Sequence, residues 1–327
     1  MKITVVIPTY RRPQSLYNCL NALKQQLRPA DEILVIVRET DNLTWKSLEN
    51  LAEDLLPLKI LTVKVSGVIA AMNLGLNFAQ GDIISFTDDD AVPHIDWLAK
   101  IEACFQTDPK LAGIGGKDLM YEGKQLVRGE KQIVGKLQWF GRMIANHHLG
   151  VGEPREVDFL KGVNMSYQTQ AVKDKLFDIR MKGSGAQVHF EVAFCLSLIR
   201  DGWKLLYDPQ IVVDHYLAER FDEDLRDSFN SVAFFNEVHN ETLAILEHFP
   251  FHQRILFMIW AVLVGTRRAF GLVQLIRFLP REGKLAFEKW LVSLQGRKQG
   301  WLSWQQSYCG QGRLGDRINL ADKKIKQ

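Results

Sequence analysis

Apolar and polar positions follow two different periods over the first 120 residues. Short, nearly continuous apolar runs predict strands that are covered on both faces. Between them, apolar residues recur every three or four positions, which is typical of helices packed on one side. The predicted strands span 3–7, 32–37, 59–65, 82–86 and 111–116, and the helices contain Leu16–Leu23, Leu48–Leu55 and Ile69–Leu76, with a further helix over 95–105. This alternation predicts an α/β fold with a mostly parallel sheet.

Three consecutive acids, Asp88, Asp89 and Asp90, follow directly after the predicted strand 82–86. Ligands of parallel sheets bind at the carboxyl ends of the strands. Neighbouring carboxylates repel one another unless a cation is close, and Mg²⁺ and Mn²⁺ prefer oxygen ligands and leave positions open for phosphate. The alternative is an exposed acidic turn that caps helix 95–105. These residues alone do not decide between a metal site and a cap.

Composition and missing motifs argue against several other functions. The chain has 327 residues and a net charge of +3, which is too small to indicate nucleic-acid binding. Its four cysteines form no CxxC pair, so we expect reduced thiols rather than zinc or thioredoxin-type chemistry. Neither GxGxxG after the first strand nor GxxxxGK[ST] occurs. A bound nucleotide would therefore need its phosphates held by something other than a glycine loop.

Three segments together carry a family resemblance. "VVIPTYRRPQSL" (5–16), "AAMNLGLNFAQGDIISFTDDDAVP" (70–93) and "FLKGVNMSY" (159–167) resemble the family 2 glycosyltransferases in order and spacing. The resemblance covers about residues 2–220. It implies the GT-A fold, a nucleotide-binding α/β sheet, over 1–220, with a donor half over about 1–120 and an acceptor half over about 121–220. Residues 221–327 are then a helical C-terminal region.

The resemblance also implies a reaction. Such enzymes move a sugar from a nucleotide-sugar, most commonly a UDP-sugar, to an acceptor hydroxyl with inversion, assisted by Mn²⁺ or Mg²⁺. The expected acceptor is a saccharide or a lipid-linked molecule, and no nucleic acid is expected. Two alternatives remain: a nucleotidyl or phosphoryl transferase on the same fold, and a degenerate sugar-binding module without activity.

The resemblance also implies site residues, at the positions of this sequence that match the family's motifs. Pro8, Thr9, Tyr10 and Arg12 match the segment that lines the nucleotide pocket, and Asn73 matches a family asparagine. Asp88 and Asp90 match the D-x-D motif, in which the first acid contacts the ribose and the second the metal. We assign both to the metal site and Asp89 to the donor-binding turn.

Two positions depart from the family pattern. Val37 and Arg38 replace the acids that usually contact the nucleobase, so we expect this contact to shift to Glu39 or Asp41. Met72 replaces an arginine that many relatives carry before the matching asparagine.

The catalytic base is assigned to Glu191. Direct displacement needs a group that takes the proton of the acceptor hydroxyl, and in the family it is an acid that follows a glycine-rich loop. Here "GSGAQVHFE" ends at Glu191. A carboxylate at the start of a helix also interacts favourably with the helix dipole, which is the structural alternative. His189 is the alternative proton acceptor.

His215, in "VVDHYLAER", matches a histidine that some family members use as a third metal ligand. Neutral imidazole suits Mn²⁺, and Asp214 is the competing candidate. His147 and His148 show no ligand spacing, and we expect both to face solvent.

The last third contains an uncharged run, Ile255–Gly265, bordered by Arg254, Arg267 and Arg268. It is too short to cross a bilayer. Basic and aromatic flanks favour a helix in the membrane interface, whereas a buried helix is the alternative. The N-terminal apolar run is cut by Pro8, which predicts a strand rather than a signal peptide. We therefore expect a cytoplasmic protein, peripheral on the inner membrane face.

Overall fold

A computed structural model describes residues 1–49, 57–222 and 229–324, and describes side chains as far as residue 306. Its N-terminal part contains four parallel strands in the order β3-β2-β1-β4: β1 (Ile3–Thr9), β2 (Glu32–Arg38), β3 (Leu58–Val63) and β4 (Ile83–Thr87). The connections contain α1 (Pro13–Lys24), α2 (Asn42–Glu49) and α3 (Val68–Phe78). The predicted strands and helices are confirmed here, except that Leu51 and Leu55 lie outside the described residues.

The sheet continues past β4 with a change of direction. β11 (Asn164–Gln168) lies antiparallel between β4 and β6 (Leu111–Glu122), and β12 (Lys204–Tyr216) runs parallel to β6. Short strands complete it: β10 (Arg155–Glu156) and β5 (Ala91–Pro93) on β12, and β7 (Gln125–Leu126) on β6. The mostly parallel α/β sheet is thus confirmed, with an antiparallel insertion between its halves.

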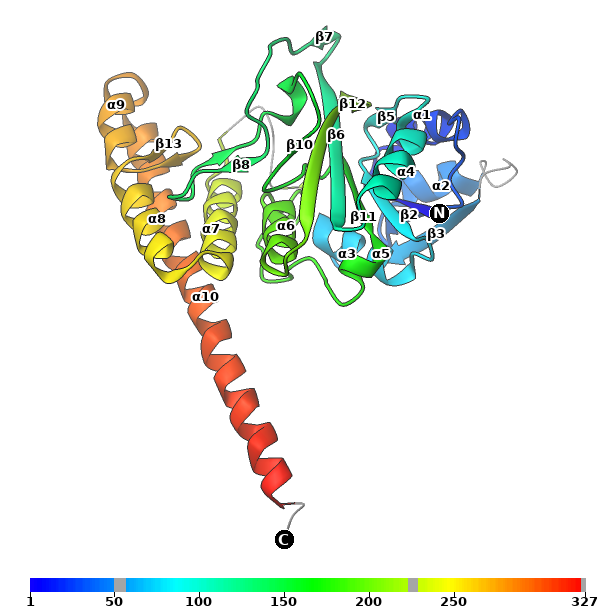
Figure 1. The fold of residues 1–327 in the computed structure, drawn as a ribbon. Helices are drawn as coiled ribbons and strands as arrows, with labels where there is room; N and C mark the ends of the chain where they lie inside the picture. The colour runs from blue at the N-terminus through cyan, green and yellow to red at the C-terminus, as the bar shows by residue number, and fades with distance from the viewer. Residues whose placement is uncertain (50–56, 223–228, 325–327) are drawn as a thin grey trace.

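Helices cover both faces of this sheet (Figure 1). Residues of β1 alternate between two cores because successive strand residues point to opposite faces: Val5 packs with α1 and α4 (Trp97–Thr107), and Val6 packs with α3 and α6 (Phe190–Arg200). A short helix, α5 (Thr169–Val172), follows β11. Cys19 and Cys195 are buried free thiols and Cys104 is half-buried, whereas the side chain of Cys309 lies outside the described part.

The connection between β7 and β10 has little regular structure. It contains β8 (Lys136–Leu137), β9 (Met143–Ile144) and a single 3-10 turn, His147–Leu149. The expectation that His147 faces solvent is wrong, because its ring is buried and its Nε2 lies 3.1 Å from the carbonyl oxygen of Phe159. His148 is half-buried.

After the sheet, the residues that the structure describes form α7 (Ser231–His248), α8 (Phe251–Leu263), α9 (Leu272–Glu282) and α10 (Lys284–Lys324). A small hairpin of β13 (Gly265–Thr266) and β14 (Ala269–Phe270) joins α8 to α9. α7 packs on α6 and on α10, so this helical layer stands beside one end of the sheet (Figure 1). Within the described residues, no helix combines the length and the apolar character needed to cross a bilayer.

Candidate active site

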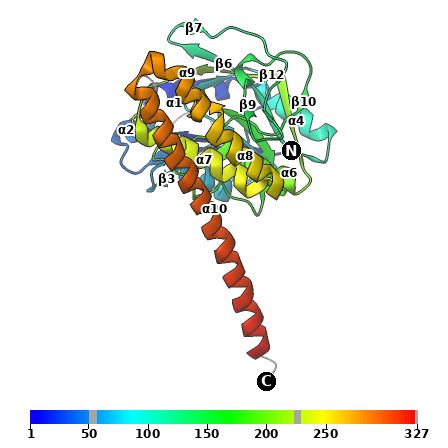
Figure 2. The ribbon, with the colours of Figure 1, turned by 90° about the vertical axis from the view of Figure 1, so that its left-hand side faces the viewer.

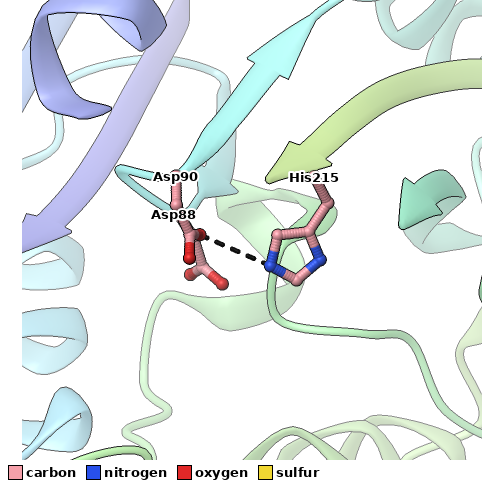
Figure 3. A group of neighbouring side chains, drawn as sticks. All are labelled: Asp88, Asp90 and His215. Carbon is pink, nitrogen blue, oxygen red and sulfur yellow. Dashed lines mark ion pairs between the residues drawn. The ribbon is translucent and has the colours of Figure 1, made fainter. Parts of the chain in front are cut away.

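The turn after β4 and the end of β12 bring two acids and one histidine together. Asp88, Asp90 and His215 each offer a ligand atom, and these atoms all lie within 4.8 Å of one another. Figure 3 shows the two carboxylates and the imidazole facing each other, with His215 Nε2 3.4 Å from Asp90 Oδ1. Burial and the charge of Asp90 raise the pKa of Asp88. Close packing of these acids favours binding of a cation.

β-strand pairing determines which residue of β12 joins the acids. β12 lies antiparallel to β5, and His215 is paired with Ala91, the residue after Asp90. Asp214 points to the other face, as alternation along a strand requires, and its Oδ1 lies 3.5 Å from His94 Nε2. The structure therefore brings His215, and not Asp214, to the two acids.

A third acid lies behind His215. Asp118 of β6 is fully buried, its Oδ2 is 3.4 Å from His215 Nδ1, and it forms an ion pair with Lys161. Burial by itself lowers the pKa of His215, but Asp118 and Asp90 outweigh it and raise this pKa to about 9. An acid on the distal ring nitrogen fixes the imidazole and increases its basicity as a ligand. Two carboxylates with an imidazole oriented in this way fit a divalent cation such as Mn²⁺, which would replace the proton on the ring nitrogen that faces the acids.

Asp89 turns away from the other two acids. It accepts hydrogen bonds from Thr9 Oγ1 (2.7 Å) and from Arg12 Nη1 (2.8 Å). Burial raises the pKa of Asp89 to about 7, although Arg12 and Thr9 favour its charged form. Arg12 also lies 3.5 Å from Asp90 and donates to the carbonyl of Glu219. Asp89 thus ties the end of β1 to the turn that carries Asp88 and Asp90.

Tyr10, the residue after Thr9, is covered by the side chain of Arg38. The guanidinium carbon of Arg38 lies 3.7 Å from the centre of that ring. Arg38 also donates to both carboxylate oxygens of Asp222 (3.2 Å each) and to the carbonyl of Ser184 (3.1 Å). Arg38, which replaces an acid that usually contacts the nucleobase, therefore links the segments that contain Tyr10, Ser184 and Asp222.

The two acids expected near the nucleobase have different surroundings. Asp41 is buried and accepts from Thr44 N–H (3.1 Å), the Thr44 hydroxyl (2.6 Å) and the N–H of Arg11, so it caps α2 and holds the residue after Tyr10. Glu39 is exposed, with an oxygen 3.8 Å from Lys64 Nζ. Of the two, Glu39 has the more accessible carboxylate.

Asn73 lies on α3 and is also engaged within the protein. Its side-chain amide donates to the carbonyl of Phe177 (2.9 Å), and its oxygen accepts from the N–H of Phe177 (2.8 Å). This pair of bonds fixes residue 177 against α3.

Glu191 stands in the first turn of α6. Its Oε2 is shielded from solvent and has no hydrogen-bond partner among the described residues. Burial raises the pKa of Glu191 to about 7, and the charge of Asp88 adds to this, whereas the backbone N–H of Glu191 and the charge of Lys161 oppose it. A carboxyl group whose pKa lies near 7, and which is electrostatically coupled to Asp88, has the properties of a general base.

The alternative proton acceptor, His189, has a different environment. Burial lowers the pKa of His189 to about 4, so it is neutral at pH 7. Its Nε2 is 3.9 Å from Glu237 Oε1 on α7. A base of such low pKa holds a proton weakly, which favours Glu191 on chemical grounds.

Two side-chain amides hold the loop that precedes Glu191. Gln187 and His189 have positive φ angles of 44° and 74°, a conformation that non-glycine residues adopt only at a cost. Gln187 accepts from the N–H of Ile69 (3.0 Å) and donates to the carbonyl of Met181 (2.9 Å).

The second amide belongs to Asn240, a buried residue of α7. It accepts from the N–H of Lys182 (2.7 Å) and donates to the carbonyls of Lys182 (2.9 Å) and Val188 (3.1 Å). A helix of the C-terminal region therefore determines the position of the residues directly before Glu191.

Sequence reasoning missed four residues of this site: Arg38 as a pocket residue, Asp118, Lys161 and Asn240. Asp118 lies beyond the strand predicted over 111–116, among residues of mixed polarity, so its burial could not be expected from the sequence. Lys161 lies in the segment "FLKGVNMSY" and Arg38 at a position of departure from the family. Asn240 carried no local signal.

Sequence comparisons point to one family. The model of glycosyl transferase family 2 matches residues 4–167. Glycosyltransferase AglE of Haloferax volcanii is 31% identical over 101 residues, which cover 30% of this chain and only 33% of that protein. A Methanococcus voltae protein is 22% identical over 277 residues, covering 80% of this chain and 81% of that one. Its name is dolichyl N-acetyl-alpha-D-glucosaminyl phosphate 3-beta-D-2,3-diacetamido-2,3-dideoxy-beta-D-glucuronosyltransferase.

Solved structures share the fold at low sequence identity. TarS of S. aureus (residues 1–349) has a TM-score of 0.60 and 17% identity, over 92% of this chain and 81% of that one. The mannosyltransferase PcManGT from Pyrobaculum calidifontis, in complex with GDP-Man and Mn²⁺, has a TM-score of 0.52 and 14% identity, over 98% and 80%. The fold is thus that of the GT-A glycosyltransferases, and with the family match over residues 4–167 the chain belongs to glycosyl transferase family 2.

Proposed function

We propose that this glycosyltransferase moves a sugar from a nucleoside-diphosphate sugar, a UDP-sugar in the first instance, to an acceptor hydroxyl with inversion at the anomeric carbon. The observation that carries the proposal is the combination of the three metal-ligand side chains with one shielded carboxyl group. The ligand atoms of Asp88, Asp90 and His215 lie within 4.8 Å of one another, and the pKa of the nearby Glu191 is raised to about 7.

The donor is proposed to bind at the carboxyl ends of β1 and β4. We assign Pro8, Thr9, Tyr10, Arg12, Glu39 and the Asp88–Asp90 turn to this edge, and Asn73 to its support through Phe177. Asp88 and Asp90 with His215 would hold Mn²⁺ or Mg²⁺, which when bound supplies positive charge against the departing diphosphate. Lys161, whose charge acts on both Asp88 and Glu191, adds a second cation on the same side.

Glu191 is proposed to complete the reaction from the acceptor side. Its deprotonated carboxylate takes the proton of the acceptor hydroxyl as the oxygen attacks the anomeric carbon opposite the diphosphate, and attack from that face inverts the configuration. Asn240 and Gln187 keep the base in position, because they hold the loop before it. The orientation of a base within hydrogen-bond reach is what makes proton transfer effective.

The acceptor is proposed to be lipid-linked. Two relatives carry names that specify dolichyl phosphate-linked sugars: the Methanococcus voltae protein, and a second Haloferax volcanii protein named glucosyl-dolichyl phosphate glucuronosyltransferase, 20% identical over 235 residues. Family membership favours glycosyl transfer over the nucleotidyl transfer that the same metal and diphosphate would also serve. The pairing of Asp88, Asp90 and His215 with Glu191 supports catalysis rather than sugar binding alone.

A thermal-shift screen tests the donor and metal assignments together. A ligand that binds only the folded state raises the melting temperature, so UDP- and GDP-sugars are compared with and without Mn²⁺. We expect a shift for UDP-sugars that disappears with a chelator. An equal shift without metal would contradict the metal assignment, and NMR of the product would contradict inversion if the donor configuration were retained.

A further inference from the structure

The most unusual surface outside the site belongs to α8 and α9. α8 buries Phe257 and Ala261 against the rest of the protein. Its opposite side is also apolar: the exposed residues include Phe251, Ile255, Ile259 and Leu263, with Phe251 73% and Ile259 51% exposed. A helix that is apolar all round is normally covered on all sides. Within the described part of the chain, nothing covers this second side.

α9 also has one buried apolar side and one exposed apolar side. It buries Leu275 and Phe278, while Ile276 is 65% exposed, and Leu272, Val273 and Leu279 are exposed beside it. At about 100° per residue these four side chains fall within an arc of about 120°. Arg277 and Arg281 fall on the next part of the helix surface. The exposed apolar arc of α9 is therefore bordered by positive charge.

The two exposed apolar sides belong to one layer of the molecule. Figure 2 shows α8 and α9 on the side turned toward the viewer, with the sheet behind them. We call the exposed apolar residues of these helices the α8–α9 face: Phe251, Ile255, Leu256, Ile259, Leu263, Val264, Leu272, Val273, Ile276 and Leu279. Ten exposed apolar side chains on two helices that contact each other indicate an interaction surface.

Apart from Glu282, the last residue of α9, the charged side chains along α8 and α9 are all positive. Between Glu247 and Glu282 the sequence contains no acid and five arginines: Arg254, Arg267, Arg268, Arg277 and Arg281. All but Arg254 are exposed. The whole chain carries 41 basic and 38 acidic residues, so this segment differs strongly from the average. Arginines bordering an apolar face complement the anionic headgroups and acyl region of a lipid surface.

We propose that the α8–α9 face docks on an anionic membrane surface, with its apolar side chains in the headgroup–acyl boundary and Arg267, Arg268, Arg277 and Arg281 on lipid phosphates. The sequence places such a contact on Ile255–Gly265, whereas the structure extends it to α9, where apolar and basic arcs adjoin. The inference does not depend on the transfer chemistry, although it suits an acceptor held in a membrane.

Vesicle flotation with the full chain tests the proposal. The bound fraction should be small with phosphatidylcholine alone, rise with added phosphatidylglycerol, and fall with salt as charges are screened. Ile276→Glu and Ile259→Glu should abolish most of the binding. The matched control is Ile179→Glu, which changes a residue 81% exposed elsewhere and should float like the wild type.

Charge variants supply a second test, which leaves the apolar side chains of the α8–α9 face unchanged. Arg277→Glu should lower the partition coefficient by about tenfold or more, whereas Lys110→Glu, with the same change in net charge at an exposed turn, should have little effect. The thermal shift with donor should remain in all variants, which separates failure of docking from failure of the proposed function.

Two results would overturn the proposal. In the first, the wild type stays unbound at every lipid composition. In the second, light scattering shows an oligomer that Ile259→Glu dissociates while vesicle binding is absent. The α8–α9 face would then be a contact between two copies of this chain.

Discussion

The two sides of the site use their carboxylates differently. In the turn after β4, Asp89 is bound by Thr9 and Arg12, and Asp90 lies against His215 and accepts from the N–H of Ala218. Burial by itself raises the pKa of Asp90, but His215 outweighs it and lowers this pKa to about 2. Glu191, by contrast, keeps an oxygen without a partner and a pKa of about 7.

This difference matches the two proposed roles, in which Asp90 binds a metal ion and Glu191 accepts a proton. A carboxylate that binds a cation must stay charged, and at Asp90 the N–H of Ala218 and the neighbouring His215 and Arg12 favour the charged form. A carboxylate that takes up a proton works best with a pKa near the working pH. The two sides also differ in support: the turn between β4 and β5 carries Asp90 and strand β12 carries His215, whereas a loop bound to α7 precedes Glu191.

The largest expected effect concerns the donor side. Asp90→Asn retains an acceptor for the N–H of Ala218 but loses the charge, so metal-dependent donor binding should disappear in titration calorimetry with UDP-sugars. Turnover should fall by more than about a hundredfold, because charge stabilisation at the leaving group is lost. Asp214→Asn removes an acid next to His215 in sequence but on the other face of β12, and it should bind donor normally. Equal behaviour of the two variants would refute the assignment.

The next effect concerns the base. Glu191→Gln should lower kcat by about a hundredfold to ten-thousandfold, the usual range for loss of a general base. The donor Kd should stay constant, because proton transfer belongs to the transition state. His189→Asn is the control, since asparagine tolerates a positive φ, and it should retain most of the activity. Loss of donor affinity in Glu191→Gln would instead indicate a structural role.

A smaller effect tests the support of the base by α7. Asn240→Leu keeps the branched shape of the side chain and removes the three bonds to Lys182 and Val188, so kcat should fall by about tenfold to a hundredfold through misplacement of the base. Donor Kd should not change. Thr242→Val, a buried polar residue on the same helix that bonds to Arg297 rather than to the loop, should lower the melting temperature without changing kcat. If both variants reduce kcat equally, α7 acts through stability alone.

The pH profile gives the smallest and most gradual effect. Glu191 must be deprotonated to accept a proton, and its pKa is raised to about 7. kcat/KM should therefore fall about tenfold per pH unit as the pH drops below that value. The residual activity of Glu191→Gln should lack this acidic limb. A wild-type rate that stays constant down to pH 5 would exclude Glu191 as the base.

Local patterns predicted much of this architecture. Apolar runs located β1, β2 and β4 to within two residues, because a strand covered on both faces needs apolar side chains at successive positions. β3 was also located, although none of its residues is buried. The helix predicted over 95–105 is observed as Trp97–Thr107, and the strand predicted over 111–116 extends to Glu122. The extension was not predicted because the residues after Gly116 are mixed in polarity. Whether residues 221–327 form a separate domain remains a proposal.

The sequence alone determined that acids stand at the carboxyl end of a buried strand, because the apolar run before them and their charge are local properties. Tertiary structure decided which other residues join them. Asp118 orients His215 although 97 positions separate the two, and Asn240 reaches a loop 58 positions earlier. Strand pairing and helix packing bring such residues together, and neither leaves a pattern in nearby sequence. The charge of each acid depends on these long-range neighbours, and so the distinction between a ligand and a base belongs to the folded protein.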